Sequence, residues 1–292
     1  MQVAEAVSHG AVSIINAMAT GKGAALGISL WTKARVTITD KAGLFKGYNL
    51  TEPDEDTRLI ELIARKIFQR FNAHRRFGAL VETQSTIPVA VGLKSSSAVS
   101  NAVALATLKA LRKKAGALKT INLGVDASLE AKVTLTGAFD DACACYFGGL
   151  VVTDNLQRKI LKRYRPKTNS RVVIHVPQRK SYTTNIDPSV FETIKPLVQT
   201  LQREVMNGNY WLALTLNGLL YSATLGCDSS PARAALESGA IAAGLSGKGP
   251  ATAAIVPNSK VEKVLDSWNS YSGRIIETSL NYESAHTLRN PN

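Results

Sequence analysis

The chain has 292 residues, of which 45% are hydrophobic and 20% are charged, and this length and composition favour a globular protein of two domains. Charged or polar residues interrupt every apolar stretch within about a dozen positions, short of the roughly 20 residues that a membrane-spanning helix needs. The first residues include Glu5 and no basic segment ahead of an apolar core, unlike a signal peptide. These features argue against a membrane protein and predict a cytoplasmic location.

The cysteine count and the net charge narrow the class further. Cys143, Cys145 and Cys227 are an odd number and lack zinc-ligand spacing, so they predict free thiols rather than disulfides or a structural metal site. The 35 Lys and Arg residues exceed the 22 Asp and Glu residues by 13. Such a surplus favours an anionic partner, which is either a nucleic acid or a small anionic substrate.

The first half of the chain predicts a mixture of strands and helices without an internal repeat. Residues 27–39 carry β-branched residues in approximate alternation and predict a strand pair or one long bent strand. An apolar stripe at helical spacing predicts a helix over residues 59–71, and residues 78–86 predict another strand. An Ala-rich run predicts a helix over residues 97–114, which Gly116 is expected to stop.

The second half continues the alternation. Residues 171–176 predict a strand, and a helix over residues 187–208 begins with Asp187 as N-cap and Pro188 at its first position. Residues 210–225 are hydrophobic almost all round, so we expect this helix to be buried between layers. Pro231 begins a short helix that ends near residue 239.

The C-terminal segment has the pattern of a split βαβ unit. Strands over residues 241–245 and 252–256 flank a glycine-rich turn, and a helix over residues 261–268 leads to a strand over residues 274–280. We place the boundary between the two domains near residue 160.

The segment PVAVGLKSSSA between the predicted strand and the long helix has the chemistry of a phosphate-binding loop. Gly92 allows a backbone conformation closed to other residues, and serines precede the helix, whose N-terminus offers unpaired N–H groups to an anion. The alternative is a serine N-cap on a core helix. The pattern G-x-x-x-x-G-K-[ST] is absent, so this is not a P-loop. The segment consists of Pro88, Val89, Ala90, Val91, Gly92, Leu93, Lys94, Ser95, Ser96, Ser97 and Ala98.

The same segment resembles the signature P-x-x-x-G-L-x-S-S-A of the GHMP kinases. The turn Gly247, Lys248 and Gly249 resembles the glycine-rich third motif of that family, and residues 136–142, TGAFDDA, resemble the stretch that holds its catalytic aspartate. The resemblance implies an α+β GHMP kinase fold. A ribosomal-protein-S5-domain-2-like domain would span residues 1–160, and a ferredoxin-like split βαβ domain would span residues 161–292.

More narrowly, the whole chain resembles the archaeal shikimate kinases. The closer match lies in INAMATGKGAALGI from Ile15, GLKSSSAVSNAVALA from Gly92, TGAFDDACACYFGGLV from Thr136 and SGKGPA from Ser246. It implies ATP-dependent phosphorylation of shikimate to shikimate 3-phosphate with release of ADP, in the chorismate pathway that supplies aromatic amino acids. ATP and Mg²⁺ are the implied cofactors, held at the loop and at Gly247, Lys248 and Gly249.

Two departures from the wider family affect the site. The serine loop is one residue longer, which leaves open which serine meets the metal, and Lys94 occupies a place usually taken by a small residue. Lys94 would add a positive charge to the phosphates, or it is an exposed loop lysine. The family's early basic residue aligns with Ala11, and we choose Lys22 as its replacement, the alternative being a solvated lysine in a glycine turn.

The resemblance assigns the catalytic work to an aspartate pair in an otherwise small and apolar segment. Asp140 aligns with the family aspartate and is the predicted general base or orienting group, with Asp141 as second choice or Mg²⁺ partner. A helix cap is the alternative. The predicted metal ligands are Ser97 and Asp140.

Shikimate is a carboxylate with ring hydroxyls, so its site needs a cationic group and neutral donors. Asn16 and Thr20, together with Lys22, are the predicted substrate-side residues. His9 is a weaker candidate, because a scattered histidine is more often structural.

Other functions remain open from the residues alone. Among enzymes, a homoserine or mevalonate kinase is the alternative. An RNA-binding protein is another, since a basic cluster ends the long helix, although the helix dipole also favours cations there. That cluster comprises Lys109, Arg112, Lys113 and Lys114. We expect a small-molecule partner, neither nucleic acid nor membrane, and a homo-oligomer is compatible with the sequence.

Overall fold

Two long strands near the N-terminus organise the larger of two sheets. In this computed structural model, which describes residues 2–134, 136–178 and 188–289, β1 (Val3–Ile15) pairs antiparallel with β2 (Lys22–Thr39). Along β1, buried side chains alternate with half-buried ones as far as His9, and every residue from Gly10 to Ile15 is buried. The alternation is that of a strand with one face in the core, so the strand passes from the edge of the molecule into its centre.

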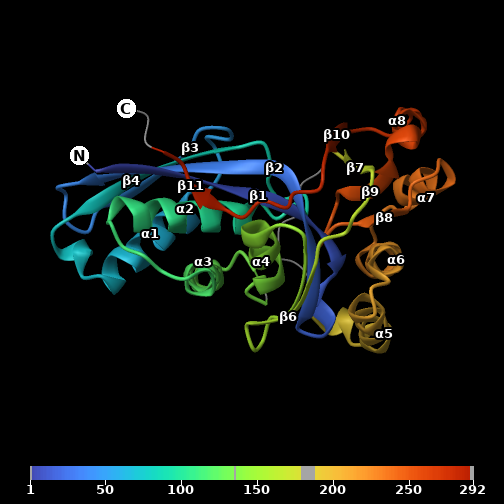
Figure 1. The fold of residues 1–292 in the computed structure, drawn as a ribbon, viewed down its shortest axis with the longest axis horizontal. Coiled ribbons are helices and arrows are strands. Elements are labelled where there is room, and N and C mark those ends of the chain that lie inside the picture. The colour runs from blue at the N-terminus through green and yellow to red at the C-terminus, as the bar shows by residue number, and fades with distance from the viewer. Residues whose placement is uncertain (1, 135, 179–187, 290–292) are drawn as a thin grey trace.

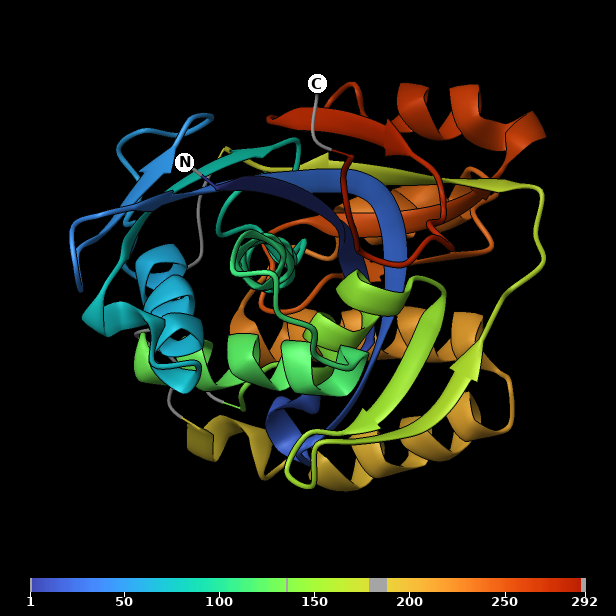
Figure 2. The ribbon, with the colours of Figure 1, turned by 60° about the vertical axis from the view of Figure 1, so that its left-hand side comes forward.

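β2 is one long strand, which confirms the second of the two predicted alternatives, and it curves through the molecule (Figure 2). Its second half pairs with β4 (Gly78–Ser85), and its first half pairs with β5 (Leu150–Asp154). The sheet has the order β11-β1-β2-β4-β3, and β5 and β6 continue it from the first half of β2. The remaining strands are β3 (Phe45–Asn49), β6 (Lys159–Tyr164) and β11 (His286–Thr287).

Four helices pack beside this sheet (Figure 1): α1 (Arg58–Arg70), α2 (Ser95–Ala110), α3 (Ala117–Glu130) and α4 (Phe139–Phe147). The apolar stripe predicted for α1 is confirmed, because Ile63, Ile67 and Phe68 are completely buried against the sheet. Among the residues described, no helix combines the length and the apolar character that a membrane crossing requires.

The smaller sheet has the antiparallel order β10-β7-β9-β8. Helices follow its first and third strands along the chain, which is the predicted split βαβ arrangement. Its strands are β7 (Ser170–Val176), β8 (Ala242–Leu245), β9 (Thr252–Pro257) and β10 (Arg274–Thr278). The helices are α5 (Lys195–Met206), α6 (Tyr210–Leu225), α7 (Ser230–Glu237) and α8 (Val261–Trp268).

The two faces of this sheet are covered by different helices. Val172 and Ile174 of β7 belong to the main core with residues of α5 and α6, whereas Val173 packs in a separate cluster with α7, α8 and the buried Trp268. The side-chain period of two in a strand produces this division. β6 ends at residue 164 and β7 begins at residue 170. The division into two domains over residues 1–160 and 161–292 stays a prediction. β11, which follows the smaller sheet in the sequence, pairs with β1 of the larger sheet.

Three helix predictions need correction. α2 begins at Ser95 and ends at Ala110, because Arg112 adopts a left-handed conformation that closes the helix. Gly116 does not stop α2; it precedes α3, which the sequence analysis missed. The helix predicted over residues 187–208 is a short 3-10 turn over Pro188–Phe191 followed by α5, and Asp187 lies outside the described residues.

The burial predicted for α6 is only half right. One face packs on β8, where Gly218 lies against Gly244 and leaves no room for a side chain on either residue. On the opposite face Leu212 and Leu216 are 52% and 42% exposed. In the described structure, this helix is therefore covered on one of its faces only, although its sequence is apolar all round.

The contact between α6 and β8 gives a test of this packing. A Cβ added at Gly218 would lie 2.3 Å from the Cα atom of Gly244, so Gly218→Ala must push two backbones apart. We expect the free energy of unfolding to fall by about 2 kcal/mol. Gly116→Ala is the control, because no atom lies within 4 Å of its added Cβ, and it should cost less than about 1 kcal/mol. Equal losses in urea unfolding would contradict the packing.

Candidate active site

A cavity of about 680 Å³ lies where β1, β2 and β4 meet the N-termini of α1, α2 and α4. This volume is in the range of small-molecule sites. Of the residues predicted for the site, twelve line the cavity: Asn16, Val89, Ala90, Gly92, Lys94, Ser95, Ser96, Ser97, Asp140, Asp141, Gly247 and Lys248. Three segments far apart in sequence, the serine loop, the aspartate pair and the glycine-rich turn, are therefore brought to one place.

The serine loop turns sharply before it enters α2. Ala90, Gly92 and Lys94 all have positive φ angles, of 57°, 91° and 64°. Lys94 stands at the N-cap, but its side chain does not cap the helix, and α2 begins at Ser95. The first N–H groups of a helix have no partner within it, so this end of α2 attracts an anion. Ser96 is exposed toward the cavity and Ser97 is 8% exposed.

The glycine-rich turn is fixed to the serine loop by hydrogen bonds from Ser246 and Ser13. The Ser246 hydroxyl donates to the carbonyl of Gly92 at 2.8 Å and accepts from the N–H of Ser13 at 3.1 Å. The N–H of Gly247 donates to Ser13 Oγ at 2.9 Å, and Asn16 Nδ2 donates to the carbonyl of Gly247 at 2.9 Å. A Cβ at Gly92 would lie 2.0 Å from the carbonyl oxygen of Ser246. Only glycine permits this approach.

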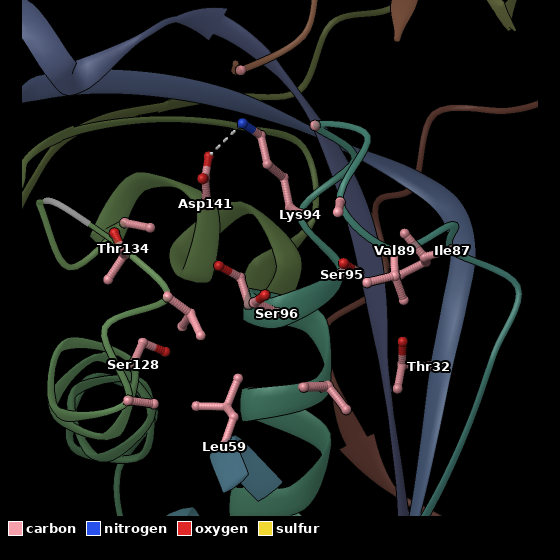
Figure 3. Close-up of a pocket in the computed structure, with 18 of the residues that line it drawn as sticks. Thr32, Leu59, Ile87, Val89, Lys94, Ser95, Ser96, Ser128, Thr134 and Asp141 are labelled. Carbon is pink, nitrogen blue, oxygen red and sulfur yellow. Dashed lines mark ion pairs between the residues drawn. The ribbon is translucent and has the colours of Figure 1, made fainter. Parts of the chain in front are cut away.

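Lys94 connects this turn to the aspartate pair. Its Nζ atom lies 3.2 Å from Asp141 Oδ1 and donates to Ser13 Oγ at 2.7 Å, and its side chain is only 7% exposed. Figure 3 shows Lys94 extending from the loop before α2 toward Asp141 at the start of α4. A buried ion pair of this kind places a fixed positive charge beside the two carboxylates.

Asp140 is the more deeply buried of the two carboxylates, with 4% exposure. Both aspartates stand in the first turn of α4, where the positive end of the helix favours negative charge. Burial raises the pKa of Asp140 to about 7, and the Asp141 carboxylate adds to the rise. Lys94 and a hydrogen bond from Asn155 oppose it. The carboxyl therefore changes charge close to neutral pH, which suits a general base.

Lys248 is the second lysine of the cavity wall. Burial lowers its pKa to about 8, the charge on Lys94 adds to the fall, and Asp141 opposes it. The two neighbouring lysines give this end of the cavity a positive field that suits phosphate or carboxylate groups.

The structure places several predicted residues away from the cavity wall. Lys22 is exposed at the start of β2, and its carbonyl accepts a hydrogen bond of 2.9 Å from Gln202. The Thr20 hydroxyl also contacts Gln202, and neither Thr20 nor Lys22 lines the cavity. His9 lies on β1 outside the lining. Five further predicted residues do not line the cavity: Pro88, Val91, Leu93, Ala98 and Gly249.

Sequence analysis missed several residues of the cavity. Ser13 joins Lys94 to the turn through hydrogen bonds. The sequence feature that points to Ser13 is its position two residues before the end of β1, close to Asn16. Thr32 and Thr83 are 1% and 4% exposed polar residues on β2 and β4. The apolar part of the lining comes from α1 and from the neighbouring segments: Leu59, Ile60, Ile87, Val99, Ala131 and Val133.

Comparison with known proteins identifies relatives over most of the chain. Residues 58–149 match the family described as GHMP kinases N terminal domain. The shikimate kinase of Methanosarcina mazei is 43% identical over 282 residues, which are 96% of this chain and 95% of that protein.

Solved structures with low sequence identity share the fold. A homoserine kinase from Cytophaga hutchinsonii has a TM-score of 0.76 at 15% identity and covers 99% of this chain and 98% of its own. The mevalonate kinase of Methanococcus jannaschii has a TM-score of 0.77 at 14% identity and covers 96% of this chain and 98% of its own. The chain therefore has the predicted GHMP kinase fold.

The buried charge of Asp140 predicts a pH-dependent cost in stability. Its folded-state pKa of about 7 lies above the ordinary value, so between about pH 4 and pH 7 the folded protein binds more protons than the unfolded chain. Stability is then lost as the pH rises through this window. We expect the free energy of unfolding of Asp140→Asn, relative to the unchanged protein, to grow by about 1.4 kcal/mol per pH unit there.

Urea unfolding across this pH range measures the difference. The control is Asp266→Asn, an exposed aspartate on α8, which should show no such growth. A constant difference between Asp140→Asn and the unchanged protein would show that Asp140 is not held with a raised pKa.

Proposed function

We propose that this chain, which belongs to the GHMP kinases and within them to the family of archaeal shikimate kinases, transfers the terminal phosphate of ATP to shikimate, giving shikimate 3-phosphate and ADP. The supporting observation in the site is the convergence on one cavity of an anion-binding helix N-terminus, a buried lysine and a carboxyl whose pKa is about 7. Phosphoryl transfer requires these three elements for positioning, charge neutralisation and contact with the acceptor hydroxyl.

In this proposal, ATP lies along the serine loop. Its phosphates approach the N-terminus of α2, where the N–H groups and hydroxyls of Ser95 and Ser96 donate to phosphate oxygens. The turn at Gly247 and Lys248 covers the phosphates, and its attachment to Ser13 and Gly92 keeps it in place. The nucleoside then contacts the apolar residues of the lining, which are Leu59, Ile60, Ile87, Val99, Ala131 and Val133.

The acceptor hydroxyl meets Asp140. An ionised Asp140 accepts the proton of this hydroxyl, or orients the hydroxyl for attack on the phosphorus. Lys94 stabilises the negative charge that spreads over the transferred phosphoryl group. The family's early basic residue was assigned from sequence to Lys22, and the geometry leads us to propose Lys94 instead, because Lys22 is exposed and does not line the cavity.

The donor set also fits Mg²⁺. Among the described residues no three His, Cys, Asp or Glu side chains form a metal cluster, but Mg²⁺ in kinases is held by one or two carboxylates together with substrate phosphates. Asp141 Oδ1 is buried, and among the described residues its one polar contact is the ion pair with Lys94. We propose Asp141 and a loop serine, Ser96 or Ser97, as the protein ligands, with Asp140 on the acceptor side. The ion would neutralise phosphate charge.

The carboxylate of shikimate requires a cation at the acceptor end of the cavity. Lys248 and Asn16 line this part of the site beside the glycine-rich turn, and we propose that they recognise the acceptor. Thr20 and Lys22, which the sequence suggests for this role, do not line the cavity, so we do not assign them to acceptor recognition.

The proposed function is tested by offering acceptors in parallel. Purified protein with ATP and Mg²⁺ should release ADP with shikimate, and not with homoserine, mevalonate or galactose. Asp140→Asn should fold and bind ATP, yet lose roughly 100-fold or more in kcat. Release of ADP with another acceptor alone, or near-normal turnover by Asp140→Asn, would overturn the substrate or the catalytic assignment respectively.

The identity of the catalytic cation is tested by a matched pair of lysine variants. Lys94→Met removes the charge beside the carboxylates and should lower kcat by at least about 100-fold, whereas Lys22→Met should change it by less than about threefold. Steady-state kinetics at saturating ATP, with unfolding curves to confirm that both variants fold, measure this. The reverse ranking would return the role to Lys22.

A further inference from the structure

A buried asparagine that belongs to no predicted motif forms two hydrogen bonds with Asp140. Asn155 follows β5 and is 4% exposed. Its Nδ2 atom donates to Asp140 Oδ1 at 2.7 Å, and its Oδ1 atom accepts from the backbone N–H of Asp140 at 3.0 Å. One amide thus binds the carboxylate and the backbone of the same residue.

The amide itself is held in a fixed orientation. The hydroxyl of Thr153, which is fully buried, donates to Asn155 Oδ1 at 2.7 Å, and the backbone N–H of Asn155 donates to the carbonyl of Gly21 at 2.8 Å. Two donors at Oδ1 identify it as the oxygen, so the nitrogen must face the carboxylate. Asn155 is therefore set by β5 and by the turn before β2, independently of α4.

The second oxygen of Asp140 lies in a gap left by a glycine. A Cβ at Gly23 would lie 2.0 Å from Asp140 Oδ2, and Gly23 pairs with Thr153 across β2 and β5. The carboxyl group is thus confined between Asn155 on one side and the backbone of β2 on the other. Asp140 has little freedom to choose another orientation.

We propose that Asn155 is a positioning residue, which fixes the orientation of the Asp140 carboxylate through its Nδ2–H donor. This inference rests on the proposed function of Asp140. A carboxylate accepts hydrogen bonds and repels another acceptor, so only a donor can hold it at this place. The position thus demands an amide, and an aspartate of the same shape cannot replace it.

The alternative is that Asn155 only holds α4 in place. The two roles lie on different atoms of the side chain, which allows them to be separated. Asn155→Asp keeps an oxygen that accepts from Asp140 N–H and Thr153, and loses the donor to the carboxylate. Asn155→Ala loses both.

Asn101 supplies a matched control. It is 1% exposed, and its Nδ2 atom donates at 2.9 Å to the carbonyl of Ala142 in the same helix α4, so its hydrogen bond goes to the backbone and not to the Asp140 carboxylate. Asn101→Ala therefore removes a buried amide that holds α4 and leaves the carboxylate contact intact.

The experiment compares the steady-state kinetics of Asn155→Ala, Asn155→Asp and Asn101→Ala with ATP and shikimate, and determines the crystal structure of Asn155→Asp. In both Asn155 variants we expect kcat to fall by about tenfold or more, because the Asp140 carboxylate loses its fixed orientation, while the KM for ATP stays within about twofold. Asn101→Ala should keep kcat within about threefold. In the crystal of Asn155→Asp, the Asp140 carboxylate should have turned away from residue 155.

An unchanged kcat in both Asn155 variants would overturn the inference, as would an equal loss in Asn101→Ala or an unmoved Asp140 carboxylate in Asn155→Asp. The crystal structure needs no turnover. If the unchanged protein failed to phosphorylate shikimate, the proposed function would fall, while the structure would still decide whether Asn155 orients Asp140.

Discussion

The burial of two adjacent carboxylates at the start of α4 is the constraint that the rest of the site satisfies. Buried charges are costly unless they are paired and hydrogen-bonded. Here the compensation comes from three sides: Lys94 from the serine loop, the positive end of α4, and the amide of Asn155 after β5. The compensation is incomplete, because burial still raises the pKa of Asp140 to about 7. Because the cost of burying this charge is not fully offset, Asp140 can gain or lose a proton near neutral pH.

Close backbone approaches allow these groups to converge. Gly92 lets the serine loop touch the glycine-rich turn, and Gly23 makes room for the Asp140 carboxylate. Ser13 then ties Lys94 to the turn through one hydroxyl. The phosphate-binding helix and the aspartates are consequently parts of one hydrogen-bonded unit, although their segments lie far apart along the chain.

Local patterns predicted much of this structure, and long-range contacts account for what they missed. α1 follows from the period of its apolar residues, and β2, β4, β7, β8, β9 and β10 lie where local patterns predict strands, whereas no pattern predicts β1 or α4. The serine loop, the aspartate pair and the turn follow from motifs. The sequence does not distinguish Lys22 from Lys94, because nothing in it shows which lysine the fold turns inward. Asn155 could not be found either, because its contact with Asp140 joins residues 15 positions apart through the pairing of β5 with β2.

Transfer of the terminal phosphoryl group of ATP to the 3-hydroxyl of shikimate can be followed by correlating ³¹P with ¹H by NMR in a mixture of the protein, ATP, Mg²⁺ and shikimate. We expect a new phosphomonoester whose phosphorus couples to the ring proton at carbon 3 of shikimate, formed in equal amount with ADP. ADP accompanied only by inorganic phosphate, or a phosphorus coupled to another ring position, would contradict it.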